Sequence, residues 1–209
     1  MLKRKKWLPL VQQRFFHAVF YFEGGIMRKW RFIVSQLVLF FIIISVNAEE
    51  VNTNMELTSP NFENQKSIAK KFTCDGGDIS PGLGWSGAPE GTKSFGLIVD
   101  DPDAPDPANP RMTWVHWVLY NIPATVSSLP EGVKDKDLPE GTLQGLNDWK
   151  KTGYGGPCPP IGTHRYFHKL YALDIVLPDL KSPTKAKLEK AMEGHIIAKA
   201  ELIGLYQRK

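Results

Sequence analysis

Two apolar segments, residues 94–99 and 113–121, place the strongest constraint on the fold. Neither has a consistently polar face, so each fits a central strand that is buried on both sides. Gly- and Pro-rich turns separate them from other short periodic segments, which predicts a mostly β sandwich with a few peripheral helices. Further strands are expected at 55–59, 67–73, 166–177 (the longest) and 196–206, with one helix that begins at Ser182–Thr184 and carries Pro183 in its first turn.

Residues 27–48 have the pattern of a secretory signal peptide. A short basic stretch precedes an apolar run over residues 32–46, and small residues stand before the expected cleavage point after Ala48. A single membrane span is the alternative, but the run is short for one, and we expect no span after cleavage. The expected organisation is an upstream extension or over-extended gene start at 1–26, the signal peptide at 27–48 and one domain at 49–209.

The positive charge of the chain is concentrated before the expected cleavage point. The whole sequence has a formal net charge of +4, but residues 1–48 contain eight of its 26 Lys and Arg and one of its 22 Asp and Glu. Residues 49–209 therefore have a net charge of −3. Since nucleic-acid binding proteins rely on a basic surface, we expect no nucleic acid partner.

Two cysteines, Cys74 and Cys158, both lie in the part expected to be exported. An even number of cysteines in an oxidising compartment favours a disulfide, although two free buried thiols are the alternative. A bridge between them would tie the loop around Cys74 to the Gly- and Pro-rich segment 153–163 and stiffen it.

That segment, residues 153–163, runs into the triplet His164-Arg165-Tyr166. Glycines allow sharp turns and leave amide N–H groups uncovered, while prolines fix the backbone between them. If a strand starts here, His164 and Tyr166 lie two residues apart and point to the same side. The segment is thus either a preformed ligand loop or an ordinary connection between strands.

A second motif supports the first of these readings. The acidic residues Asp101 and Asp103 follow the apolar segment 94–99, and the next strand carries Trp114-Val115-His116-Trp117. If the two strands pair, one pocket collects carboxylates, two imidazoles, a phenol and loop amides between tryptophan and proline walls. Such donors suit a phosphate or carboxylate, and an aspartate can hold an imidazole or accept from an ammonium group. The candidate ligand-binding residues are Asp101, Asp103, Trp114, His116, His164 and Tyr166.

Together these motifs resemble the phosphatidylethanolamine-binding protein family, also called Raf kinase inhibitor-like proteins, and are most similar to its bacterial branch. The residues that carry the resemblance are 101–105 (DPDAP), 114–117 (WVHW) and 155–166 (GGPCPPIGTHRY), with 72–76 (FTCDG) typical of the bacterial branch. The resemblance implies a sandwich of two antiparallel sheets with a small anion pocket at one end. It also implies ligand contacts from Asp101, His116, His164 and Tyr166, with Gly156 and Pro159 shaping the rim.

The resemblance implies binding rather than catalysis. We therefore expect an exported protein, periplasmic or secreted, that binds a small anionic or phosphorylated ligand such as a phospholipid head group. We expect no catalytic residues, no metal ligands and no cofactor. Inhibition of a protein partner, which stays unidentified, and a homodimer are open alternatives.

A hydrolase is the main alternative function. The segment Gly84-Trp85-Ser86-Gly87 does not have the spacing of a serine nucleophile elbow, because the second glycine comes one residue early. The aspartates and histidines of the two motifs are competent metal ligands. His164 could also act as a general acid or base on a phosphate ester, so turnover of such an ester separates the two functions.

Overall fold

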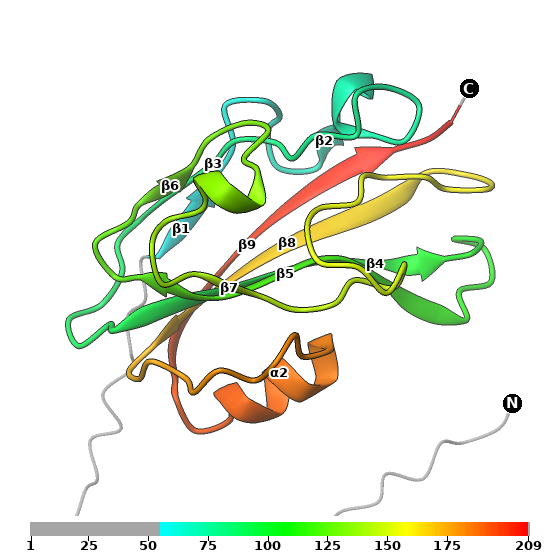
Figure 1. The fold of residues 1–209 in the computed structure, drawn as a ribbon. Helices are drawn as coiled ribbons and strands as arrows, with labels where there is room; N and C mark the ends of the chain where they lie inside the picture. The colour runs from blue at the N-terminus through cyan, green and yellow to red at the C-terminus, as the bar shows by residue number, and fades with distance from the viewer. Residues whose placement is uncertain (1–54, 209) are drawn as a thin grey trace, which may run out of the picture. The chain divides into compact units, whose positions relative to one another are not determined.

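The structure is a computed structural model that describes residues 55–208. The expected signal peptide at 27–48 and the segment before it lie outside these residues. The described chain forms two sheets and one α-helix, with the sheets packed face to face (Figure 1). Within the described range, none of the helical segments is long and apolar enough to cross a membrane.

The large sheet has six strands and contains the two apolar segments at its centre. Its spatial order is β2 (Lys66–Ser67), β9 (Ile196–Tyr206), β8 (His164–Leu173), β4 (Ser94–Ala104), β5 (Met112–Pro123) and β7 (Leu143–Gln144). The small sheet has the order β1 (Glu56–Thr58), β3 (Leu83–Ser86) and β6 (Ser128–Leu129). All of these strand pairs are antiparallel except the two-residue pair β2–β9. The predicted two-sheet β-sandwich is confirmed.

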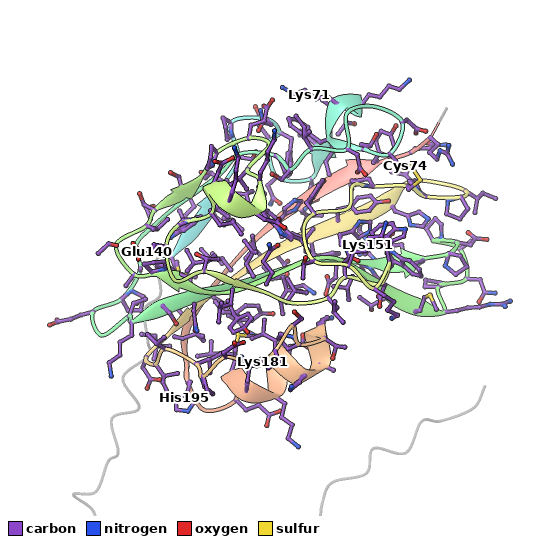
Figure 2. All side chains as sticks on the ribbon, viewed as in Figure 1. Lys71, Cys74, Glu140, Lys151, Lys181 and His195 are labelled. Atoms are coloured by element: carbon purple, nitrogen blue, oxygen red, sulfur yellow. A yellow bond between two sulfur atoms is a disulfide. The ribbon has the colours of Figure 1, made fainter. Side chains whose placement is uncertain are left out.

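Both faces of the large sheet are covered, which explains why its central strands lack a polar face. Alternate residues of a strand point to opposite sides. Leu97 faces the core between the sheets, while Ile98 faces a second core beneath helix α2 (Lys185–Met192). Side chains fill the space between the layers (Figure 2). The helix contributes Leu188 and Met192, both fully buried.

The strand predicted at 67–73 is wrong for most of its length. Only Lys66–Ser67 pairs with β9, and the chain then turns through a 3₁₀ helix, η1 (Lys70–Phe72). The two apolar residues that suggested a strand, Ile68 and Phe72, are both buried in the core between the sheets. A spacing of four residues brings two side chains to one side of a helical turn as well as of a strand, so the spacing alone was ambiguous.

Other boundaries also differ from the prediction. Strand β8 begins at His164 and ends at Leu173, and β5 is longer than it, at 12 against 10 residues. The chain leaves the sheet after Leu173 and is then held by the Asn121 side chain, which donates to the Leu177 carbonyl and accepts from the Leu177 N–H.

At the helix, Pro183 precedes the first turn. The N-cap is Thr184, whose side chain accepts a hydrogen bond from the Lys187 N–H. The long segment 127–152 is mostly loop but also contains β6, β7 and a second 3₁₀ helix, η2 (Asp135–Asp137).

Candidate anion-binding site

A pocket of about 340 Å³ opens where β4, β5 and β8 meet the segment after Gly156. It brings together five of the eight residues predicted to bind a ligand, from two sequence motifs about 50 residues apart. These five are Asp101, Trp114, His116, Pro159 and His164. The remaining lining residues are Ala104, Pro105, Met112, Trp149, Cys158 and Pro160.

Two irregularities in the β4–β5 pairing direct side chains toward this pocket. Val99 pairs with Trp117 but Asp100 pairs with Val115, so β5 has one extra residue, His116, at this point. Beyond Asp101, β4 in turn has one residue more than β5 before the strands pair again. A bulge of this kind bends a strand and re-aims its side chains, and bulges are frequent beside functional sites. Here they turn neighbouring side chains of both strands toward one end of the sandwich.

His164 is held between two acceptors. Its Nδ1 lies 2.7 Å from Oδ2 of Asp101, and its Nε2 lies 3.0 Å from the carbonyl oxygen of Ile161. An imidazole can donate from both nitrogens only when it is protonated. The geometry therefore suits a His164 imidazolium paired with the Asp101 carboxylate, whose Oδ1 also accepts from the Asp103 N–H at 2.8 Å. The side chains of His164, Asp101 and Asp103 are all buried.

His116 has a different environment. Its Nδ1 lies 2.6 Å from the Gly155 carbonyl oxygen, and the Gly155 N–H donates back to the His116 carbonyl at 3.0 Å. Because a carbonyl only accepts, Nδ1 carries the proton, and Nε2 of the neutral ring is an acceptor. Burial lowers the pKa of His116 below its usual 6.5, so the ring is neutral at pH 7.

Tyr166 lies between the two histidines, behind the pocket lining. Its ring centroid is 5.2 Å from that of His116 and 6.4 Å from that of His164. The hydroxyl is buried and has no hydrogen-bond partner within residues 55–208. Burial, and next the nearby Asp101 carboxylate, raise the pKa of Tyr166, so the group stays a neutral donor.

Asp103 and Gly156, the other two predicted residues, are not among the side chains that line the pocket. Asp103 binds the Arg165 guanidinium at 2.6 and 2.9 Å and accepts the Arg165 N–H at 2.9 Å. These hydrogen bonds hold the pKa of Asp103 below its usual value. The Gly156 N–H donates to Asp78 at 2.7 Å, and a Cβ at this position would collide with the Phe72 carbonyl oxygen. Both residues position the backbone around the pocket, and direct ligand contact from them stays a prediction.

Trp149 lines the pocket although it was not among the predicted ligand-binding residues. Its ring packs edge-on against Trp114 at 5.4 Å and His116 at 5.2 Å between centroids. It belongs to the long segment 127–152, which carries no periodicity that would place it near β5. Trp117, by contrast, lies in the core between the sheets.

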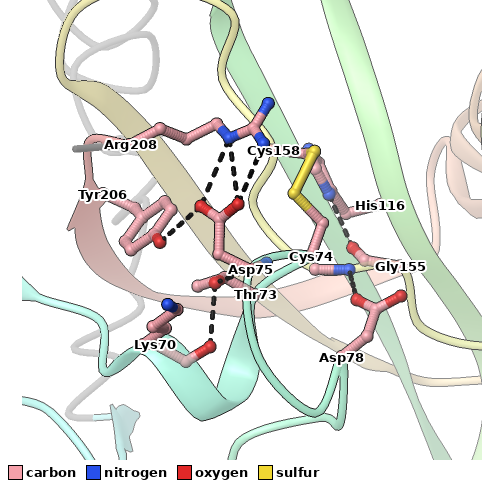
Figure 3. Close-up of a disulfide and its surroundings, with 11 residues drawn as sticks. Lys70, Thr73, Cys74, Asp75, Asp78, His116, Gly155, Cys158, Tyr206 and Arg208 are labelled. Atoms are coloured by element: carbon pink, nitrogen blue, oxygen red, sulfur yellow. Dashed lines mark hydrogen bonds and ion pairs between the residues drawn. A yellow bond between two sulfur atoms is a disulfide. The ribbon is translucent and has the colours of Figure 1, made fainter.

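The predicted disulfide is present and borders the pocket. Cys74 and Cys158 are bonded across 84 residues of sequence, and Cys158 lines the pocket. Figure 3 shows the bond beside the His116–Gly155 pair. On the Cys74 side, Asp75 accepts from the Tyr206 hydroxyl at 2.8 Å and from Arg208 Nε at 3.0 Å. The bridge therefore joins a well-anchored turn to the wall of the pocket.

Comparison with known proteins gives the family of the chain. The profile of the phosphatidylethanolamine-binding protein family matches residues 58–207. The chain belongs to this family. Among curated relatives, a UPF0098 protein of Methanothermobacter thermautotrophicus is 48% identical over 155 residues, which cover 74% of this chain and 99% of the relative. A UPF0098 protein of Aquifex aeolicus is 48% identical over 157 residues, covering 74% and 89%.

Together with these relatives, solved structures place the chain in the bacterial and archaeal branch of the phosphatidylethanolamine-binding proteins. A putative homologue from Chlamydia trachomatis is 44% identical, with a TM-score of 0.69 over 75% of this chain and 99% of its own. YbcL of E. coli, described as a new member of the mammalian family, is 38% identical, with a TM-score of 0.67 over 74% and 99%. The resemblance inferred from the two motifs is thereby confirmed.

Proposed function

We propose that the protein is an exported, non-enzymatic binding protein whose pocket holds a small phosphate-like anion, such as a phosphorylated head group. The observation that carries this proposal is the Tyr166 hydroxyl. It is buried without a hydrogen-bond partner among residues 55–208, on a ring that packs against two histidines that line the pocket. A buried polar group without a hydrogen bond is costly, and a ligand oxygen within reach would satisfy it.

The pocket supplies a mixed set of groups to such a ligand. Neutral His116 offers a lone pair on Nε2, which can accept the proton of a P–OH group or take up a proton and donate to a P–O⁻ oxygen. His164 Nδ1 lies 2.7 Å from the Asp101 carboxylate, so a positive charge on this ring would be balanced by Asp101. A compact anion, or a zwitterion whose ammonium group reaches a carboxylate, suits this set better than a bare multivalent anion.

Binding without turnover is supported by the way His164 is held. Both ring nitrogens of His164 face fixed acceptors, which leaves no free nitrogen to shuttle a proton. The pocket lining contains no serine, threonine or lysine that could act as a nucleophile. Among residues 55–208, no three His, Cys, Asp or Glu side chains are grouped so that they could hold a metal ion.

Exposed apolar side chains around the pocket opening support a ligand that is part of a larger molecule. Two exposed apolar side chains line the pocket, Met112 at 54% and Trp149 at 41% exposure, and Ile161 at 59% follows Pro160 of its wall. Exposed apolar side chains gathered around a polar site often mark an interaction surface. A phospholipid or a phosphorylated protein partner would provide both the anion and the contact area, so modulation of a partner is part of the proposal. Export is supported by the disulfide, which is typical of oxidising compartments.

A titration of the purified full chain with inorganic phosphate and phosphoethanolamine, followed by calorimetry, tests this function. The variant Tyr166→Phe removes only the unpartnered hydroxyl. It should lose about tenfold or more in affinity, as expected for a hydrogen bond to a charged group, and should not lose stability. Tyr206→Phe, whose hydroxyl binds Asp75, is the matched control and should bind as the wild type does.

Equal affinity in Tyr166→Phe and the wild type would contradict the proposed site. The hydrolase alternative is tested in parallel with a phosphate ester: turnover by the wild type that disappears in His164→Ala would replace binding with catalysis as the function.

A further inference from the structure

We propose that the Cys74–Cys158 bond is a site of thiol–disulfide exchange that controls the anion pocket; this rests on the function proposed above. Cys158 is exposed and lines the pocket, so a small dithiol can reach its sulfur from solvent. A disulfide buried in a core would not be open to such attack, because exchange depends on access to the sulfur.

The residues just before Cys158 are held by several contacts besides the disulfide. The Tyr154 hydroxyl donates to the Phe72 carbonyl at 2.9 Å, and the Gly156 N–H donates to Asp78. The Pro157 carbonyl accepts the Cys74 N–H at 3.1 Å. This part of the loop therefore stays in place whether or not the sulfurs are bonded.

The next residues, 158–160, have the disulfide but no hydrogen bond within residues 55–208 to hold them, although Pro159 is also buried. Pro159 and Pro160 have no N–H to donate, and within the described residues this segment makes no hydrogen bond at all. The next anchor is the Ile161 carbonyl, which accepts from His164. Since three pocket-lining residues form this segment, we call it the cystine wall (Cys158–Pro160).

Reduction would release the cystine wall rather than the turn on the other side of the bond. The Cys74 turn is fixed by Asp75, which binds Tyr206 and Arg208 (Figure 3), and by internal hydrogen bonds such as Gly76 N–H to the Thr73 carbonyl. Movement of the wall displaces Pro159 from the pocket and disturbs the acceptor of His164 Nε2. The expected consequence is a weaker anion site on an intact sandwich.

The chemistry requires a dithiol as reductant. Its first thiolate attacks Sγ of Cys158, which forms a mixed disulfide and expels Cys74 as a thiolate. The second thiol of the reductant, once deprotonated, then attacks the reductant's other sulfur, which is bonded to Cys158 in the mixed disulfide. This step expels Cys158 as a thiolate. Two electrons and two protons pass from the dithiol to the protein, which ends with two thiols while the reductant ends as a disulfide.

The test compares phosphate affinity of the full chain when oxidised, when reduced with dithiothreitol under native conditions, and after reoxidation. We expect reduction to weaken binding about tenfold, comparable to re-ordering the backbone of one residue, because Pro159 and Pro160 keep their φ fixed, and we expect reoxidation to restore it. The double variant Cys74→Ser/Cys158→Ser should bind like the reduced chain and should not respond to the reductant. Circular dichroism checks that each form keeps its fold.

Equal phosphate affinity in the oxidised and reduced forms would overturn the proposal. If the oxidised chain binds no phosphate, the proposed function fails instead. The exchange proposal is then judged by the His164 ring signals and by amide hydrogen exchange at Cys158 and Ile161. No change in either on reduction would overturn it, and a change confined to this segment would support it.

Discussion

At the scale of single residues, His116 sets the protonation chemistry of the pocket. Its Nδ1–H is committed to the Gly155 carbonyl, so only Nε2 can respond to a ligand. An anion that has no proton of its own requires an N–H donor at Nε2 of His116. In the protein without ligand this ring is neutral, because burial lowers the pKa of His116, so Nε2 carries no proton. Binding of such an anion is therefore coupled to proton uptake.

Sulfate, which stays fully ionised between pH 5.5 and 8, isolates this coupling. Because the bound state carries one more proton than the free state above the lowered pKa of His116, affinity should rise as pH falls, by up to about tenfold per unit. The measurement is a sulfate titration by calorimetry at several pH values. In His116→Gln the slope should vanish, and a slope that persists in this variant would show that another group takes up the proton.

His168 affects stability rather than binding. It is fully buried, and desolvation lowers its pKa from 6.5 to about 4. Between these values the unfolded chain binds a proton that the native chain does not, so stability is complete above pH 6.5 and falls as pH drops toward 4. The shift corresponds to about 3 kcal/mol at most.

Urea unfolding at pH 7.5 and pH 4.5 measures this loss. The variant His168→Leu should show a smaller difference between the two pH values than the wild type. His195→Leu, in which an exposed ring paired with Asp174 is removed, should keep the full difference. Equal pH dependence in His168→Leu and the wild type would contradict the assignment.

At the scale of elements, a buried charge cluster joins helix α2 to the large sheet. Asp100 of β4 is fully buried and binds Lys169 of β8 at 2.7 and 2.9 Å and Lys185 of α2 at 2.7 Å. Asp100 lies next to Asp101 in β4 but on the opposite face, so this cluster backs the strand that carries the pocket aspartate.

Asp100→Ala should destabilise the protein by about 2–3 kcal/mol, because it leaves two half-buried ammonium groups without their carboxylate. Glu131→Ala, which removes one partner of the exposed pair with Lys71, should cost no more than about 1 kcal/mol. Chemical denaturation of both variants at pH 7 gives the comparison. A cost for Asp100→Ala no larger than that for Glu131→Ala would mean that the cluster does not stabilise the docking of α2.

The elements also show where sequence patterns were sufficient. The unbroken apolar character of residues 94–99 and 113–121 predicted central strands, and both faces of these strands are indeed covered. The segment 67–73 was predicted wrongly because Ile68 and Phe72 reach the same core through a turn. Bulges such as the one at His116 depend on the register between two strands, which the pattern of a single strand does not contain.

At the scale of the whole molecule, the pocket is assembled from distant parts of one chain. The two motifs were recognisable because each combines prolines or glycines with chemically active side chains, and the disulfide followed from the cysteine count. Trp149 was not assigned to the site, because its position depends on how a long aperiodic segment folds back onto β5. The ion pair of Asp103 with Arg165, adjacent to the pocket, could likewise be seen only from the tertiary structure.

The central claim is that an anion binds between His116, His164 and Tyr166. The most direct test is a phosphate titration of the full chain followed by NMR of the histidine ring signals, with His168 and His195 as internal references. The account predicts saturable shifts at His116 and His164 that are lost or strongly weakened in Tyr166→Phe. No shifts at millimolar phosphate, or shifts confined to the exposed His195, would contradict it.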